Sequence, residues 1–183
     1  EGTRITGGRT VLTRRQVQNA GTYAGRVVRT FSSASTNDMA NKSGWYLDWL
    51  TPPSNTKEGE RVVSSARIYK TIKSVLIVSS IIPIDDPCVP GGRGYVNGLD
   101  PYTGAAVNDG IFNINGDTSF ADDKLGSSFV GSFDLDVGLP GEPVVIGNRL
   151  VVGGSLAKIS DVLLNMPTGA AFKGRISWRE IVR

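Results

Sequence analysis

Residues 91–107 hold the feature that most constrains the fold, a short run of β-forming residues that ends in a tight turn. The run contains Tyr95, Val96 and Leu99, and the turn has the sequence Asp100-Pro101-Tyr102-Thr103-Gly104. In such a turn the Asp side chain accepts hydrogen bonds from nearby backbone N–H groups, Pro fixes φ, and Gly adopts a positive φ. We therefore predict a strand up to Leu99, a turn over 100–104, and the start of a returning strand that runs to Val107.

Short segments of this kind recur along the chain. Twenty-three glycines and nine prolines among 183 residues separate about ten β-rich runs, and no segment has the pattern of a long helix. The predicted strands are 10–18 and 22–31 (a hairpin with its turn at 19–21), 44–50, 60–69, 73–83, 133–137, 144–152 (a hairpin turning at Gly147-Asn148), 162–166 and 172–181.

The predicted fold class is all-β, with antiparallel strands and hairpins. Propellers use about four strands per blade and four to eight blades, so about ten strands make only two to three blades. We therefore expect part of a modified β-propeller. The chain is either a single all-β domain over 1–183 or the C-terminal propeller segment of a longer protein, with an N-terminal hairpin and loop in 1–43 and blade-like strands in 44–183.

The segment 44–50 is the most aromatic part of the chain. In an extended conformation Trp45, Leu47 and Trp49 share one face. Such a stripe is more often part of a hydrophobic core than a ligand platform, and we predict that it packs in the core.

The residues that are missing from the sequence exclude several kinds of site. There is no histidine, and Cys88 is the single cysteine. This excludes Ser-His-Asp and Cys-His nucleophiles, His-ligated zinc and Cys-cluster metal sites, whereas Asp/Glu, Lys, Tyr or Ser-Lys chemistry stays open. The longest apolar run, 75–83, is interrupted by two serines and falls short of the roughly 20 residues that span a bilayer. We expect no membrane-spanning segment.

The charges are unevenly distributed. Residues 1–30 contain six arginines against Glu1, whereas 100–136 contain seven aspartates against Lys124. We interpret both sets as solvated faces of strands and loops. No nucleic-acid-binding motif accompanies the arginines, so we expect no nucleic-acid partner.

One group of oxygen-bearing side chains is a weak candidate for a metal site. Asp109, Asn113, Asn115 and Asp117 lie at alternate positions near Gly116, and calcium takes six to eight oxygen ligands. In a strand these side chains would line one face rather than converge, so we favour Asx turns over a metal. We predict that the neighbouring pair Asp122-Asp123 lies in a surface loop. No catalytic or cofactor-binding residue is predicted.

Three landmarks in fixed order carry a family resemblance. The first is Lys42-Ser43-Gly44-Trp45-Tyr46-Leu47-Asp48 followed by Gly59-Glu60-Arg61-Val62-Val63. The second is Asp86-Pro87-Cys88 with Gly91-Gly92-Arg93-Gly94-Tyr95 and Leu99-Asp100. The third is Gly174-Arg175-Ile176-Ser177-Trp178-Arg179-Glu180-Ile181. Together they resemble the C-terminal part of the PilY/PilC type IV pilus biogenesis and adhesion proteins, from about Thr10 to Arg183.

The resemblance implies a non-enzymatic, secreted protein at the bacterial cell surface, the pilus tip or the outer membrane. Its C-terminal region would be a modified propeller that supports pilus extension and surface attachment. The implied partners are minor pilins or other tip subunits, a host or abiotic surface, and the remainder of its own propeller. Relatives hold calcium in an aspartate-rich loop upstream of the Gly44–Asp48 segment, so calcium would bind outside this chain and no cofactor is expected within it.

Two other classes share the propeller and remain as alternatives. Leu-Asp-x-x-Thr-Gly turns, like 99–104 here, also occur in quinoprotein dehydrogenases of the pyrroloquinoline quinone type. That class needs a cofactor pocket with a carboxylate base, a metal and a stacking aromatic, and the sequence shows no such set. The other alternative is a propeller scaffold protein of outer-membrane assembly.

Overall fold

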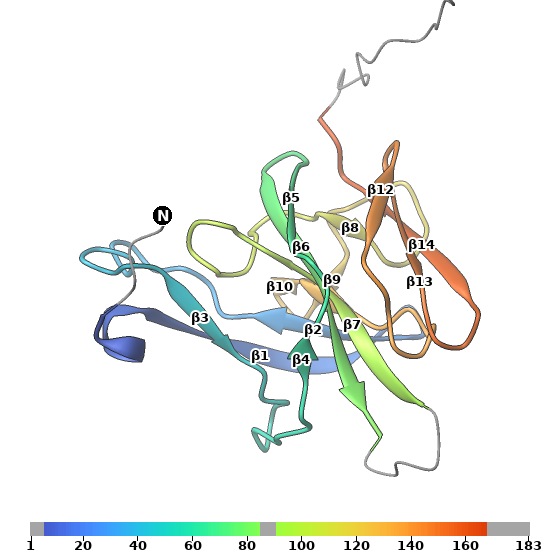
Figure 1. Ribbon diagram of the computed structural model, residues 1–183. Helices are drawn as coiled ribbons and strands as arrows, with labels where there is room; N and C mark the ends of the chain where they lie inside the picture. Colours follow the sequence, from blue (N-terminus) through green and yellow to red (C-terminus); the bar gives the residue numbers. More distant parts are fainter. Residues whose placement is uncertain (1–5, 85–90, 168–183) are drawn as a thin grey trace, which may run out of the picture.

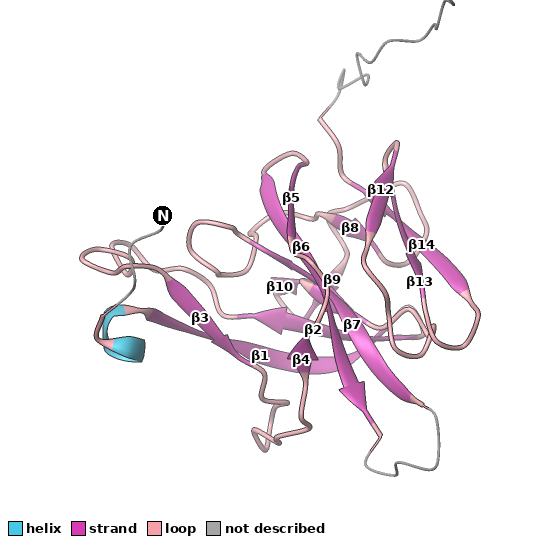
Figure 2. Cartoon of the chain, viewed as in Figure 1, coloured by secondary structure: helices cyan, strands magenta, loops and turns pink. Residues whose placement is uncertain are grey.

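The computed structural model describes residues 6–84 and 91–167, and in these residues the regular secondary structure is all β-strand except for one short 3₁₀ helix, η1 (Gly8–Val11) (Figures 1 and 2). This confirms the all-β prediction. The predicted strand 172–181 and Cys88 lie outside the described residues.

Most strands belong to one curled, eight-stranded sheet (Figure 1). Its order is β3-β1-β2-β11-β7-β6-β4, and β5 pairs with another part of β6. The strands are β1 (Thr13–Tyr23), β2 (Arg26–Phe31), β3 (Trp45–Asp48), β4 (Arg61–Val62), β5 (Arg67–Lys70), β6 (Ser74–Pro83), β7 (Gly92–Leu99) and β11 (Ser132–Phe133). One pair departs from the expected antiparallel pattern: β3 runs parallel to β1, because the segment between β2 and β3 carries the chain back to the start of β1.

The second sheet has four antiparallel strands in the order β12-β13-β14-β8, the strand number of one propeller blade. The strands are β8 (Phe112–Asn113), β12 (Val144–Ile146), β13 (Arg149–Gly153) and β14 (Ile159–Leu164), and a separate ribbon pairs β9 (Lys124–Leu125) with β10 (Ser128–Phe129). The predicted hairpin at Gly147-Asn148 is confirmed, since β12 and β13 pair on either side of it. The predicted strand 133–137 is shorter than expected and ends at Phe133, although Leu135 and Val137 are buried.

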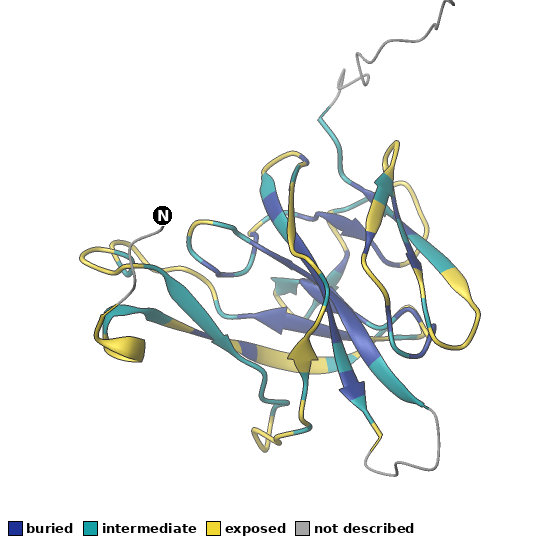
Figure 3. Ribbon diagram, in the orientation of Figure 1, coloured by how far each residue is buried: buried dark blue, intermediate teal, exposed yellow. Residues whose placement is uncertain are grey.

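The main hydrophobic core lies between the two sheets. Val28, Ile77 and Val96 come from the large sheet and pack with Leu150 and Val162 of the small one. The rings of Phe112 and Phe133 meet across this core, edge to face, with centroids 4.9 Å apart. Burial is densest along β6 and β7 (Figure 3), and β6 is buried on both faces, as a continuous apolar run favours.

The tight turn after β7 forms as predicted. One carboxylate oxygen of Asp100 accepts hydrogen bonds from the backbone N–H groups of Tyr102 and Thr103, and Gly104 has φ +68°. The predicted returning strand is wrong. Ala105 and Val107 are buried, but Ala106 donates its N–H to Ser32 instead of joining a ladder with β7.

The N-terminal hairpin also forms, but its predicted turn at 19–21 is wrong. The turn residues are Ala24 (φ +50°) and Gly25 (φ +76°), and Asn19, Ala20 and Gly21 continue β1 in pairing with β2. Two central residues with positive φ are typical of the type I′ turn that matches strand twist. An irregularity in register between Val17 and Asn19 lets the strand run through the residues that resemble a turn.

Candidate functional site

A fully buried arginine lies at the centre of the large sheet. The Arg29 side chain, on β2, is 1% exposed and makes two hydrogen bonds to the carboxylate of Glu60, at 2.6 and 2.8 Å. The Glu60 side chain is only 2% exposed. This bidentate geometry is the strongest arrangement for such a pair.

Two further N–H groups of Arg29 also have partners, so that every guanidinium nitrogen makes at least one hydrogen bond. Its Nε donates to Ser132 Oγ at 3.1 Å, and one Nη donates to Asn97 Oδ1 at 3.2 Å. The guanidinium carbon lies 3.5 Å from the centre of the Tyr95 ring, a close cation–π contact. The arginine thereby connects β2, β7, β11 and the segment that precedes β4. Since its hydrogen bonds are satisfied internally, we assign it a structural role.

A second ion pair lies beside this network, nearer to solvent. Arg93 pairs with Glu58 and also lies against Tyr95. A hydrogen bond from Thr51 and the charge of Arg93 lower the pKa of Glu58, and burial raises the pKa of Tyr95. These groups hold the segment 51–60 against one face of the large sheet.

The tryptophan stripe packs as predicted. Trp45, Leu47 and Trp49 lie against a second cluster of Val17, Phe31 and Leu99, on the face of the sheet opposite the main core. The indole N–H of Trp45 donates to the carbonyl of Pro101, at 3.1 Å. The three side chains are half-buried, so the stripe packs along the margin of this smaller cluster.

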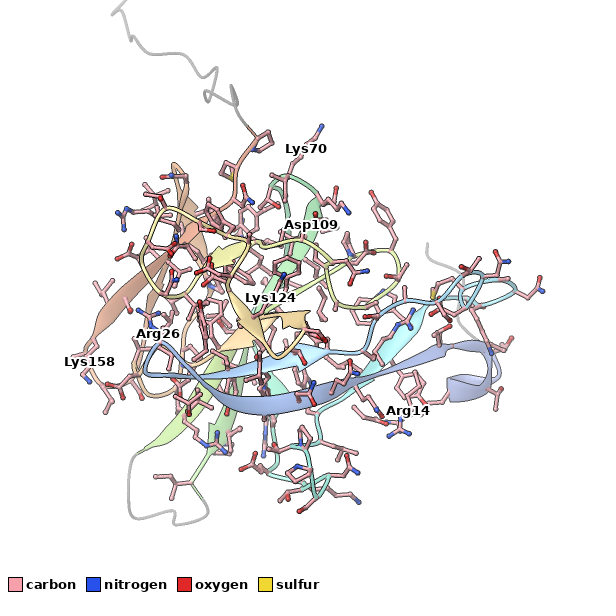
Figure 4. All side chains as sticks on the ribbon, turned by 180° about the vertical axis from the view of Figure 1, so that it is seen from behind. Arg14, Arg26, Lys70, Asp109, Lys124 and Lys158 are labelled. Carbon is pink, nitrogen blue, oxygen red and sulfur yellow. The ribbon has the colours of Figure 1, made fainter. Side chains whose placement is uncertain are left out.

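The candidate metal residues are divided between two places. Asp109 pairs with Lys73 at 2.5 Å, on a part of the molecule distant from the β1–β2 turn (Figure 4). Asn113 ends β8, and Asn115 and Asp117 lie in the loop that follows. Their side-chain oxygens accept the N–H groups of Gly116, Asp117 and Ser119, respectively. These are the Asx turns that the sequence predicts. Within 6–84 and 91–167, no three His, Cys, Asp or Glu side chains form a group suited to a metal ion.

The same loop has an acidic centre around Tyr23. The amide nitrogen of Asn115 lies 3.0 Å from both Asp117 Oδ2 and Asp122 Oδ2, and 3.3 Å from the Tyr23 hydroxyl. Burial, together with the charges of Asp122 and Asp123, raises the pKa of Tyr23.

Asp123 differs from the surface residue that the sequence suggests. It is 1% exposed, and its Oδ1 accepts the backbone N–H of Ile114 at 2.7 Å. Its Oδ2 is buried and has no partner among the described residues. Burial accordingly raises the pKa of Asp123. In contrast, hydrogen bonding from Ser119 lowers the pKa of its exposed neighbour Asp122.

Sequence reasoning missed Arg29, Glu60 and Asp123. The signal for Arg29 was its place inside the run Val27–Phe31, where every neighbour is hydrophobic or β-branched. No local pattern marks Glu60, because it is 31 residues away and meets Arg29 only through the fold.

Fold and side chains together define a class. The described residues form an all-β, propeller-like domain whose buried charges are mostly paired internally. No helix among them is long and apolar enough to cross a membrane.

The comparisons with known proteins name the relatives. A type IV pilus biogenesis factor PilY1 homolog from Xylella fastidiosa is 32% identical over 187 residues, which cover this whole chain and 14% of that protein. Type IV pilus biogenesis factor PilY1 of Pseudomonas aeruginosa PAO1 is 37% identical over 79 residues, 43% of the chain and 6% of that protein. The crystal structure of the Pseudomonas aeruginosa PilY1 C-terminal domain superposes with a TM-score of 0.64 at 21% identity, covering 89% of this chain and 33% of that one. No known family profile matches the chain.

This chain is therefore a PilY1-type C-terminal region, as the three landmarks indicate. It spans only 14% of the length of the Xylella relative.

Proposed function

We propose that this chain acts as the C-terminal segment of a type IV pilus biogenesis factor, in a non-enzymatic role at the bacterial cell surface. The observation that carries the proposal is the 32% identity to the PilY1 homolog over the entire chain. The internal pairing of the Arg29 guanidinium with Glu60, Ser132 and Asn97 supports a scaffold rather than a reactive centre.

More specifically, the segment supports pilus extension and surface attachment. Its partners are minor pilins at the pilus tip and a host or abiotic surface, and calcium binds elsewhere in the longer protein. A rigid β scaffold suits this role, because loops on packed sheets present contacts at little cost in entropy.

Of the proposed partners, the remainder of the propeller has the most support, because the exposed side chains of this chain are suited to contact it. Several large apolar side chains are exposed on strands at the sheet margins: Val62, Ile68, Val144 and Ile146. Among the described strands, β12 pairs on one side only, with β13. Propellers leave only short, protected strand edges, so the neighbouring blades of a longer protein would cover these positions.

The test uses a piliated bacterium that encodes this chain, with residues 6–167 deleted from the gene. We expect loss of surface pili and of pilus-driven motility. If the segment acts in extension, disabling retraction restores pili in the deletion strain, and if it also contacts surfaces, attachment stays low. The matched control is Arg14→Gln, a change at an exposed residue, which leaves both properties unchanged. Normal piliation and motility in the deletion strain would exclude the proposed role.

A further inference from the structure

A polar cavity of about 330 Å³ lies between the tip of the β1–β2 hairpin and the small sheet. Ala24 and Arg26 line it from the hairpin, and Asn115 and Gly116 line it from the loop after β8. On the small sheet it is lined by β13 and β14, which contribute Arg149, Asp161, Val162 and Leu163.

Arg26 lies at the hairpin tip, at the opposite end of β1 from Arg14 (Figure 4). Its Nη1 is buried and has no hydrogen-bond partner within the described part of the chain. No carboxylate among these residues lies within ion-pair distance of Arg26. Arg26 as a whole is half-buried, but this one nitrogen is shielded from water, so an acceptor from outside the chain would satisfy it favourably.

The neighbouring carboxylates do not supply that acceptor. Asp117 and Asp122 accept from the Asn115 amide. Asp161 pairs with Arg149, which projects from the adjacent strand. The two arginines and Asp161 leave the cavity lining with a single positive charge.

This charge, and the acidic loop nearby, favour a ligand with one negative charge over a phosphate or a polyanion. A carboxylate fits best, because its two oxygens match the planar fork of a guanidinium. The cavity has room for more than bound water, since one water takes about 30 Å³ and small-ligand sites begin near about 300 Å³. Its walls are preformed by a type I′ turn and by the paired strands β13 and β14.

We propose that the cavity between Arg26 and Arg149 is a binding site for a single carboxylate group, which is held by the Arg26 guanidinium. The carboxylate comes from a glutamate side chain of a polypeptide or from a free acid such as a sugar acid. This proposal does not depend on a role in pilus biogenesis.

The test is an NMR titration of the whole 183-residue chain. The probes are N-acetylglutamate N-methylamide for a polypeptide side chain and galacturonate for a sugar acid, with N-acetylglutamine N-methylamide and galactose as their neutral counterparts. We expect saturable shifts of the amide signals of Ala24, Gly25 and 114–116 with at least one acid and with neither neutral compound. The acid that binds more tightly identifies the source of the carboxylate.

Three variants make the test specific. Arg26→Gln weakens binding at least tenfold, whereas Arg14→Gln leaves it unchanged. Asp161→Asn removes the negative charge from the lining and tightens binding at least threefold, a gain that misfolding does not produce. The absence of saturable shifts with both acids, equal shifts with the neutral compounds, or unchanged binding by Arg26→Gln would each overturn the proposal.

Discussion

At the scale of single residues, the Arg29–Glu60 pair has the largest consequence. Both side chains are almost completely removed from water, so each charge depends on the other. Removal of one partner leaves the other charge buried and unpaired, which is strongly destabilising. Folding therefore requires that the segment before β4, which carries Glu60, packs against Arg29 of β2.

We predict that Arg29→Met and Glu60→Gln each lower the free energy of unfolding by about 3–5 kcal/mol. The double variant should lose clearly less than the sum, because the second change removes the charge that the first left unpaired. Urea denaturation measures all three. Arg67→Met is the matched control: Arg67 also pairs with a glutamate, Glu142, but its side chain is 61% exposed, so the change should leave the free energy of unfolding almost unchanged. Equal losses for Arg29→Met and Arg67→Met would contradict the structural role.

A second prediction concerns the buried carboxylate of Asp123, whose pKa is raised by burial. A raised pKa in the folded state means that the ionised form opposes folding. Asp123→Asn should therefore raise the free energy of unfolding at pH 7, by about 1 kcal/mol, since the orphaned oxygen is replaced by a neutral amide. The gain should diminish as the pH falls through the folded-state pKa, where the wild type itself becomes neutral.

The adjacent Asp122 gives the control with the opposite sign, because its pKa is lowered in the folded state. The ionised Asp122 carboxylate therefore stabilises the folded state. This contribution is fully present above the pKa of the unfolded state, which is about 4, and it is lost as the pH falls through the lower pKa of the folded state. Asp122→Asn should thus be less stable than wild type at pH 7, with the gap closing in acid. If Asp123→Asn and Asp122→Asn change the free energy of unfolding at pH 7 in the same direction, the two carboxylates do not occupy the contrasting environments described above.

At the scale of elements, the turn after β7 couples a local motif to the aromatic core. Gly104 has φ +68°, and a Cβ built on it would lie 2.1 Å from Cδ2 of Trp45. The glycine is therefore required twice, for its backbone conformation and for the close approach of the indole ring.

We predict that Gly104→Ala lowers the free energy of unfolding by about 1–2 kcal/mol for the left-handed backbone and by a further ~1–3 kcal/mol for overpacking. Gly147 separates the two effects, since it has φ +65° but a Cβ added there would meet no atom within 4 Å. Gly147→Ala should show only the backbone cost. Thermal or urea unfolding of both variants makes the comparison, and equal losses would mean that contact with Trp45 adds nothing.

The elements that could be predicted from the sequence are those whose conformation depends on residues within the element itself. The turn at 100–104 and the β12–β13 hairpin follow from residues within each turn, and both were predicted correctly. The turn at Ala24-Gly25 was missed because Asn19-Ala20-Gly21 looks like a better turn, yet pairing with β2 keeps those residues extended. Burial of Asp123 and the Arg29–Glu60 pair depend on packing between distant segments, which no short pattern encodes.

At the scale of the whole molecule, two sheets enclose one core while apolar side chains remain exposed at their margins. Ile68 is 62% exposed and Ile146 is 64% exposed, and both lie on short marginal strands. Such strands invite further pairing. The central claim is that this chain is one segment of a propeller that the rest of a longer pilus biogenesis factor completes.

Amide hydrogen exchange tests this claim most directly, by comparing the isolated chain with the same residues inside that longer protein. In the longer protein we expect exchange at 144–146 and 67–70 to slow at least tenfold, because neighbouring strands cover these margins, while β6 and β7 keep their rates. Equal exchange at 144–146 and 67–70 in both proteins would contradict the account.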